Sequence, residues 1–367
     1  MFSSLSPSTS VVWGGFVLAF VFGFVANKTN FCTMGAISDV VNMEHWGRVR
    51  MWLLAIAVAM LGANALDYHG LIDLPKSIYL RPRLSWLSLL LGGSLFGVGM
   101  TLAGGCSNKN LVRLGGGSLR SLVVLVFMGI SAYMTLKGLF GQWRANYLDP
   151  VAFDLGALGL STQGLHSILA RVAGLPQKTA QLVSVGAASL ALLMFVFKDK
   201  RFRANTSQVL GSFVLGLLVA AAWYLTGHIG FGEDPQTLET VYFATASHTL
   251  ESLSFVAPTA YSLELLMLWT DQSLHPSFGV ASVLGVVLGS YTYAISTGQF
   301  RWEGFASLED LRTQLLGAIL MGFGGVTALG CTIGQGLSGV STLALGSFIA
   351  LAGILAGAVV TMKWQQR

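Results

Sequence analysis

Each of the three cysteines in this 367-residue chain stands in a short polar segment that directly follows a long apolar run. The segments read NFCTMG (residues 30–35), GGCSN (104–108) and LGCTIGQG (329–336). A thiol hydrogen-bonds weakly and is polarizable, so it suits a soft, sulfur-bearing anion better than phosphate or chloride. A lone buried cysteine is more often a small packing residue, but the shared placement of all three favours a role in lining a ligand path.

Glycines and hydroxyl residues beside the cysteines indicate how an anion could be held. A helix that breaks at glycine and restarts exposes unpaired N–H groups and the positive end of its dipole, which together bind an anion without a basic side chain. We expect Ser107, Thr332 or Thr33 to cap the restarted helices and leave the other N–H groups for a ligand. The predicted site residues are Asn30, Cys32, Gly105, Cys106, Ser107, Gly330, Cys331, Thr332, Gly334 and Gln335.

Other chemistries find little support in the sequence. The cysteine number is odd, and no CxxC or Cys/His metal spacing occurs, so neither a disulfide framework nor a metal site is expected. No GxxxxGK[ST] phosphate-binding loop is present, which argues against an ATPase. No segment resembles a quinone, haem or flavin site. We therefore expect no cofactor and no enzymatic activity.

The composition predicts that a membrane surrounds these segments. Hydrophobic residues make up 53% of the chain and charged residues 10%, whereas a soluble domain carries about 25% charged residues. The apolar residues fall in stretches of roughly 20, enough to cross a bilayer, and the backbone in lipid must then be helical. We predict an all-α integral membrane protein with about nine transmembrane helices. The predicted spans are Val11–Ala26, Met51–Leu66, Leu84–Ala103, Leu119–Phe140, Thr179–Phe197, Gln208–Thr226, Phe278–Thr297, Thr313–Leu329 and Leu345–Met362.

One further apolar segment, Val241–Trp269, is interrupted by His248, Glu251, Pro258 and Glu264. Uncompensated charges in lipid are costly, so we interpret the segment as re-entrant or interfacial, and a tenth span is the alternative. His248 and Glu251 are three residues apart and would share a helix face. They could form a gating or proton-coupling pair, or a solvated face at the membrane interface.

The chain repeats itself with an offset of 225 residues, which places Cys106 over Cys331. Five predicted spans separate the starts of the two copies, and an odd number makes the repeat inverted, with a substrate site expected near the midplane. We predict one transmembrane domain over 1–367 in a 4+1+4 arrangement: repeat halves at 11–140 and 208–362, a connecting segment with a central span at 141–207, and re-entrant half-helix loops that meet at the midplane. The pairs matched at this offset are Gly92/Gly317, Leu95/Leu320, Gly97/Gly322, Gly99/Gly324, Ala103/Ala328 and Gly105/Gly330. The first span repeats too, at a different offset, with the pairs Gly14/Gly211, Phe16/Phe213, Val17/Val214 and Leu18/Leu215.

Loop charge predicts the orientation. With nine spans, the loops on the C-terminal side hold 14 of the 21 basic residues. The positive-inside rule then places the C-terminus in the cytoplasm and the N-terminus outside. The net charge of +5 is accounted for by this loop bias, so no nucleic-acid partner is expected, and membrane lipid is the expected surrounding.

At the cysteine segments the sequence resembles the YeeE/YedE family of bacterial inner-membrane sulfur-compound transporters, whose best-understood members take up thiosulfate. The resemblance covers nearly the whole chain, and its most specific parts are Gly330–Gly339, Ala103–Cys106 with Arg113 behind it, and Asn30–Cys32. It implies an hourglass-shaped protein in which Cys32, Cys106 and Cys331 pass the substrate along by S–H···S contacts. It also implies a small soluble TusA-like sulfur carrier as a cytoplasmic partner.

Two departures from the family pattern bear on the substrate. This chain has Lys28-Thr29-Asn30 where thiosulfate members usually have an arginine, and Ser107-Asn108-Lys109 where they have Ala-Thr-Gly. The expected substrate is thiosulfate or a closely related sulfur anion. The alternatives are a selenium or other sulfur compound, or a membrane redox or persulfide-handling protein.

Overall fold

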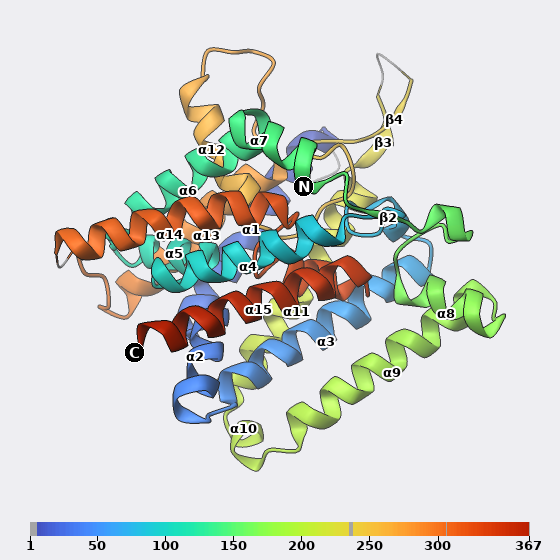
Figure 1. The fold of residues 1–367 in the computed structure, drawn as a ribbon, viewed down its shortest axis with the longest axis horizontal. Helices are drawn as coiled ribbons and strands as arrows, with labels where there is room; N and C mark the ends of the chain where they lie inside the picture. The colour runs from blue at the N-terminus through green and yellow to red at the C-terminus, as the bar shows by residue number, and fades with distance from the viewer. Residues whose placement is uncertain (1–5, 235–237, 306, 367) are drawn as a thin grey trace.

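The computed structural model describes residues 6–234, 238–305 and 307–366, and about 71% of the protein is helical (Figure 1). Two short antiparallel ribbons complete the fold, β1 (Arg83–Leu84) with β2 (Phe153–Asp154) and β3 (Phe231–Glu233) with β4 (Thr240–Tyr242). The long helices of the described residues are α1 (Pro7–Lys28), α3 (Gly47–Tyr68), α4 (Trp86–Leu102), α6 (Leu119–Lys137), α9 (Gln177–Phe197), α11 (Thr206–Tyr224), α13 (Phe278–Ser296), α14 (Leu308–Thr327) and α15 (Leu345–Gln365).

Shorter helices fill the connections between the long ones. Two of them follow a cysteine directly, and a turn of π-helix follows the third. The short elements are α2 (Thr33–Met43), α5 (Ser107–Gly115), α7 (Leu139–Trp143), α8 (Leu165–Ala173), α10 (Lys200–Ala204), α12 (Val256–Met267), the 3-10 turns η1 (Leu74–Lys76) and η3 (Gly156–Leu158), and the π turns η2 (Arg144–Leu148), η4 (Leu225–Ile229) and η5 (Gly334–Gly339).

Eight helical segments of the described chain are long and apolar enough to span a membrane. They match eight of the nine predicted spans, and the prediction of an all-α integral membrane protein is confirmed. The ninth predicted span corresponds to α14, which is 20 residues long but less apolar, because Glu309, Asp310 and Arg312 lie in its first turns. Helix α14 packs along α4 and α6, which both belong to the eight.

The segment 241–269 does not form a tenth full span. Helix α12 has 12 residues, about 18 Å at 1.5 Å per residue, whereas the hydrocarbon core is about 30 Å thick. The shared helix face predicted for His248 and Glu251 is wrong, because both residues precede α12 in irregular chain. Helix α12 begins only at Val256, with Pro258 in its first turn, where proline is tolerated. His248 is exposed with φ 54°, and the Glu251 carboxylate accepts the Ser247 N–H.

The long helices exchange neighbours between the two predicted halves. Helix α1 packs along α13 and α3 packs along α11, while α4 contacts α14 and α15 and α14 contacts α4 and α6. If α1, α3, α4 and α6 are matched with α11, α13, α14 and α15, each of these contacts recurs with the roles exchanged. This reciprocity is the pattern of a two-fold related pair. The exact boundaries at 11–140, 141–207 and 208–362 stay a prediction.

Glycines of the repeat bring α4 and α14 into backbone contact. A Cβ on Gly92 would lie 2.9 Å from the Gly324 carbonyl oxygen, and a Cβ on Gly317 would lie 2.6 Å from that of Gly99. The repeat matches Gly92 with Gly317 and Gly99 with Gly324, so the two contacts are copies of each other. These glycines therefore serve close helix packing, which fixes the backbone ends from which the segments of Cys106 and Cys331 emerge.

Candidate functional site

The same backbone turn precedes each cysteine. The residue two positions ahead has a left-handed backbone, with φ 52° at Asn30, 67° at Gly104 and 57° at Leu329. Glycine and asparagine favour this conformation, whereas a leucine there is strained. The N–H of the next residue bonds the carbonyl five positions back, which closes a Schellman turn and ends the long helix. These bonds are Phe31 to Ala26 at 3.0 Å, Gly105 to Met100 at 2.9 Å and Gly330 to Gly325 at 2.8 Å.

The cysteines themselves occupy the capping position of the restarted chain. Cys32 and Cys106 have extended backbones and are the N-cap residues of α2 and α5. The Cys32 Sγ accepts the Gly35 N–H at 3.3 Å, and the Cys331 Sγ accepts the Gly334 N–H at 3.4 Å. The prediction that hydroxyl side chains cap these helices is wrong, because the hydroxyl residue comes one position later, inside the first turn.

The three segments meet at the centre of the protein. The side chains of Cys32 and Cys106 are adjacent, and Cys106 also lies beside the hydroxyl of Thr332. Cys331 has Tyr79 nearby. All three cysteines are buried and free. Residues 226 positions apart in the sequence (332 − 106) are thereby brought together, because the side chains of Cys106 and Thr332 are neighbours.

Several buried polar atoms around the thiols have no partner among the described residues. Buried polar groups are nearly always hydrogen-bonded, and leaving one unpaired costs about 1–3 kcal/mol. A cluster of them beside three thiols marks a place where a polar ligand can complete the bonding. The atoms are Ser107 Oγ, Asn108 Oδ1, Thr332 Oγ1 and Gln335 Oε1.

The remaining predicted site residues shape the turns or stand at their edges. A Cβ on Gly330 would meet the Gln335 N–H at 3.1 Å, and one on Gly334 would collide with Ser254 Oγ at 2.5 Å. A Cβ on Gly105 would meet Lys109. Asn30 is exposed, and its Oδ1 accepts a hydrogen bond from Lys109 Nζ at 2.6 Å, so Asn30 lies at the rim and not among the thiols.

Two adjoining cavities of about 300 and 310 Å³ lead to the Cys331 segment, and we call them the Arg81 vestibule. They share Tyr79, Arg81, Arg144 and Leu329, and they reach Gln335 and Gly330, respectively. Further polar atoms without a partner in the described chain face the first cavity, Thr327 Oγ1 and Ser347 Oγ. Sequence reasoning missed this basic vestibule, although the run Arg81-Pro82-Arg83 between two apolar spans was a signal for it.

A smaller basic cavity shares no lining residue with the Arg81 vestibule and includes Lys109, the hydrogen-bond partner of Asn30. This cavity, which we call the Lys109 mouth, has a volume of about 150 Å³ and is lined by Lys109, Arg113, Arg301 and Glu303, among others. Arg113 Nη1 donates to the Gly104 carbonyl oxygen at 2.7 Å, which braces the turn before Cys106. Positive charge therefore borders the central thiols on both sides.

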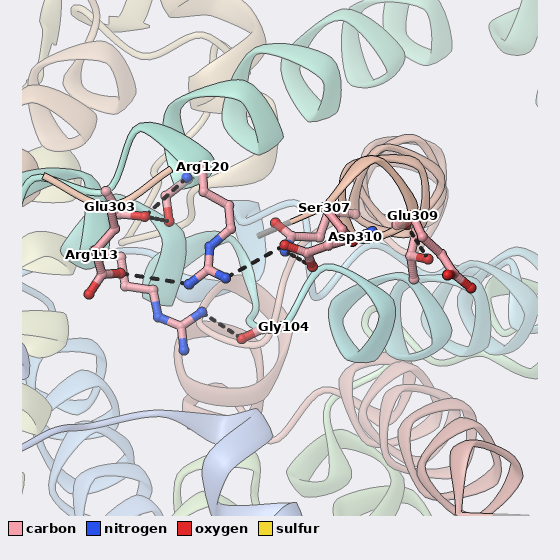
Figure 2. A network of polar contacts seen from close by, with 11 residues as sticks. Gly104, Arg113, Arg120, Glu303, Ser307, Glu309 and Asp310 are labelled. Carbon is pink, nitrogen blue, oxygen red and sulfur yellow. Dashed lines mark hydrogen bonds and ion pairs between the residues drawn. The ribbon is translucent and has the colours of Figure 1, made fainter. Parts of the chain in front are cut away.

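The connection between α13 and α14 is fastened across the Lys109 mouth. The Glu303 N–H donates to the Gly117 carbonyl oxygen at 3.2 Å, and the Leu119 N–H donates to the Glu303 carbonyl oxygen at 2.9 Å. Figure 2 shows Arg120 between two carboxylates, at 3.6 Å from Glu303 and 3.8 Å from Asp310. Gly117 has φ 101°, and a Cβ there would strike the Arg301 carbonyl, so the fastening requires glycine.

Comparison with known proteins identifies the family of this chain. Residues 28–360 match the family described as "Sulphur transport". The chain is 27% identical to the thiosulfate transporter TsuA of Escherichia coli over 364 residues, covering 97% of this chain and 94% of that protein. It is 26% identical to the thiosulfate transporter TsuA of Spirochaeta thermophila over 366 residues, covering 96% and 98%. With its central thiols and its full-length family match, the chain belongs to the sulphur transport family, the YeeE/YedE family of membrane transporters.

Proposed function

We propose that the protein imports thiosulfate, or a closely related sulfur-containing anion, into the cytoplasm through a path lined by Cys32, Cys106 and Cys331. The observation that carries the proposal is the cluster of partnerless buried polar atoms around the three thiols. The printed names of both relatives support the substrate class. The cysteines act as soft hydrogen-bonding surfaces, and no covalent step is required of them.

The proposed path runs from the Arg81 vestibule to the Lys109 mouth. Gly330 and Gln335 border the vestibule, so Cys331 meets the anion first. Cys106 lies beside both Thr332 and Cys32, so it occupies the middle of the path. Cys32 is the last thiol, with the charges of Lys109 and Arg113 near it. An anion would thus be attracted at each end and handed between neutral groups in the centre.

Neutral groups at the centre suit both entry and release. Moving an unpaired ion into a low-dielectric interior costs tens of kcal/mol in the idealised limit, so hydroxyls, helix N–H groups and thiols must replace its water. A buried fixed cation would offset more of that cost, but it would also retain the ion. Several weak sites in series let an ion enter and leave again.

Uptake of ³⁵S-thiosulfate into cells that express this chain, with unlabelled competitors, tests the proposal. We expect thiosulfate to compete fully, and selenium analogues or other sulfur anions to compete less. Full competition by a selenium compound at lower concentration would assign the alternative substrate. Growth on thiosulfate as sole sulfur source separates import from the redox alternative. A persulfide-handling protein without transport would leave uptake at the background of cells that lack the gene.

The protein is a multi-pass membrane protein, and we propose that it resides in a bacterial inner membrane. The N-terminus would be periplasmic and the C-terminus cytoplasmic, since α14 then provides the ninth span. A reporter fused after the last residue is expected to read cytoplasmic, and one fused ahead of Val11 periplasmic. If both reporters read the same side, the number of spans is even and α14 does not cross.

An imported sulfur anion needs an acceptor, and we propose a TusA-like sulfur carrier docked on the cytoplasmic basic face. Lys200, Arg201 and Arg203 are exposed on α10, beside the ion pair of Arg50 and Asp199 at 2.6 Å. Reversing the three α10 charges to glutamate is expected to abolish co-purification of the carrier and to lower uptake severalfold. Unchanged co-purification and uptake, with insertion verified, would leave these charges with an orienting role only.

Uptake should also depend on pH through Glu251, which lines the vestibule. Burial raises the pKa of this carboxyl, partly offset by the hydrogen bonds from Ser247. Below the raised pKa the carboxyl is neutral, and above it the carboxylate repels the incoming anion. Uptake is therefore expected to fall as the pH rises through this pKa. Glu251→Gln should remove the fall, whereas Glu233→Gln on exposed strand β3 should keep it, which a pH series of initial uptake rates can measure.

A further inference from the structure

We propose that a groove between α9 and α15 holds one acyl chain of an anionic phospholipid. The groove has a volume of about 450 Å³ and is floored by α3, with walls from α9, α15 and α2. Its lining is apolar except for Thr33 and the indole N–H of Trp52. Both polar atoms are buried without a partner in the described chain. Representative lining residues are Ile37, Leu53, Ile56, Ala191, Leu192 and Leu355.

The length of the groove matches one leaflet of a bilayer. On α3 it extends from Val49 to Met60, which is 11 residues (60 − 49), or about 16 Å at 1.5 Å per residue. Half of a hydrocarbon core of about 30 Å is about 15 Å. All four helices around the groove lie in segments long and apolar enough to span the membrane. Lipid is therefore the abundant apolar molecule at this place, and a single chain fits from the interface to the middle.

The Val49 end of the groove is rich in positive charge. Arg50 stacks over Phe195 of α9 at 5.4 Å, so the last turn of α9 lies beside the first turn of α3. Arg48 and Arg50 are paired with Asp39 and Asp199 at 2.8 and 2.6 Å.

Two lysines at the same end are free to meet a headgroup. Lys198 and Lys363 are exposed and have no ion-pair partner among the described residues. Lys198 lies six residues beyond Leu192 on α9, and Lys363 lies eight residues beyond Leu355 on α15. At 1.5 Å per residue these are about 9 and 12 Å further toward the interface. Basic pockets between membrane helices select anionic headgroups.

The lipid would contact the back of the central site. Thr33 and Ile37 in the groove wall belong to α2, the helix that begins at Cys32. Val340, which directly follows the π turn after Cys331, closes the groove near the middle. A bound chain would thus stabilise two of the three cysteine segments from behind. The proposal does not depend on which anion is transported.

Phospholipid analysis of the purified full-length protein tests the proposal. The chain is extracted in mild detergent from a membrane that holds phosphatidylglycerol and phosphatidylethanolamine, and bound lipid is counted by native mass spectrometry. We expect about one phosphatidylglycerol per protein. Ala191→Trp, which fills the groove, should lower that occupancy at least fivefold. Leu190→Trp is the matched control, because Leu190 is the neighbouring exposed residue on α9 and does not line the groove.

A second variant protects the test against misfolding. Leu355→Trp fills the same groove from α15 and should also displace the lipid, with monodispersity verified by size exclusion. Lys198→Ala with Lys363→Ala should reduce the preference for phosphatidylglycerol over phosphatidylethanolamine. Equal occupancy in wild type and in folded Ala191→Trp, a bound lipid that is only zwitterionic, or a different apolar molecule in the groove would each overturn the proposal.

Discussion

Cys106→Ala and Cys331→Ala are each expected to lower the initial rate of thiosulfate uptake by at least about 30-fold, while the protein still inserts normally. Each thiol is fully buried beside polar atoms that have no hydrogen-bond partner in the described chain. Removing one thiol leaves the dehydrated anion without one of its hydrogen-bond contacts, which costs about 2 kcal/mol. That cost corresponds to a factor of about 30 in rate.

Serine variants separate sulfur softness from polarity at the same positions. Serine keeps a hydroxyl of similar size but is less polarizable, so Cys106→Ser and Cys331→Ser should remain weak. Wild-type uptake in the double serine variant would contradict the proposed path. Ser282→Ala is the matched control, since its buried hydroxyl on α13 bonds the Phe278 carbonyl of its own helix and no other group of the described chain. Cys32→Ala should have the smallest effect of the three, because Cys32 has no cysteine counterpart in the second half.

Gly289→Ala is expected to destabilise the protein by about 3 kcal/mol or more and to lower the folded yield. A Cβ there would strike the backbone of Phe20 in α1, including its carbonyl oxygen. Backbone that cannot yield forces the two helices apart, and overpacking of this kind costs about 1–3 kcal/mol or more. Helix association in lipid depends on such close packing. Thermal denaturation in detergent, followed by tryptophan fluorescence, measures the loss.

Gly186→Ala is the control, because it is the same substitution on α9 with nothing within 4 Å of the new Cβ. Alanine is the better helix former by up to about 1 kcal/mol, so this variant should be unchanged or slightly more stable. An equal loss of stability in both variants would show that glycine at 289 serves the helix itself and not its contact with α1.

The long helices other than α14 follow from the sequence because each lies in an apolar run of about membrane thickness. The predicted span Phe278–Thr297 and the helix Phe278–Ser296 differ by one residue. Hydropathy says less about α14, whose charged first turns lower its average while its packing on α4 and α6 remains that of a central helix. The matched glycines Gly92/Gly317 and Gly99/Gly324 make the same backbone contact in both copies, which gives their recurrence in the sequence a packing reason.

The site was predictable in its residues but not in its detailed bonding. The cysteine segments stand out as a repeated pattern, yet the pattern does not reveal whether the cysteine or the next residue is the N-cap. Cys32 and Thr33 are adjacent, and the position of the Schellman turn at Asn30 makes Cys32, and not Thr33, the N-cap residue. The sequence analysis did not predict the Arg81 vestibule, because the positive-inside rule explains the basic residues of the inner loops and assigns no role to the smaller number in the outer loops. The pairing of His248 with Glu251 presumed a helix that starts only at Val256.

The reciprocal packing of the helices has a consequence for how the chain is made. Helix α1 is synthesised first, but it packs along α13, whose first residue lies 250 positions after the end of α1 (278 − 28). Helix α3 likewise packs along α11, which is synthesised later. Contacts between such distant parts of a chain form late, so the glycine-lined faces of the early helices stay uncovered until most of the protein has been inserted. A ribosome that stops before α13 would release a membrane-bound fragment in which the α13-facing side of α1 stays uncovered. Such a fragment would be a substrate for membrane proteases.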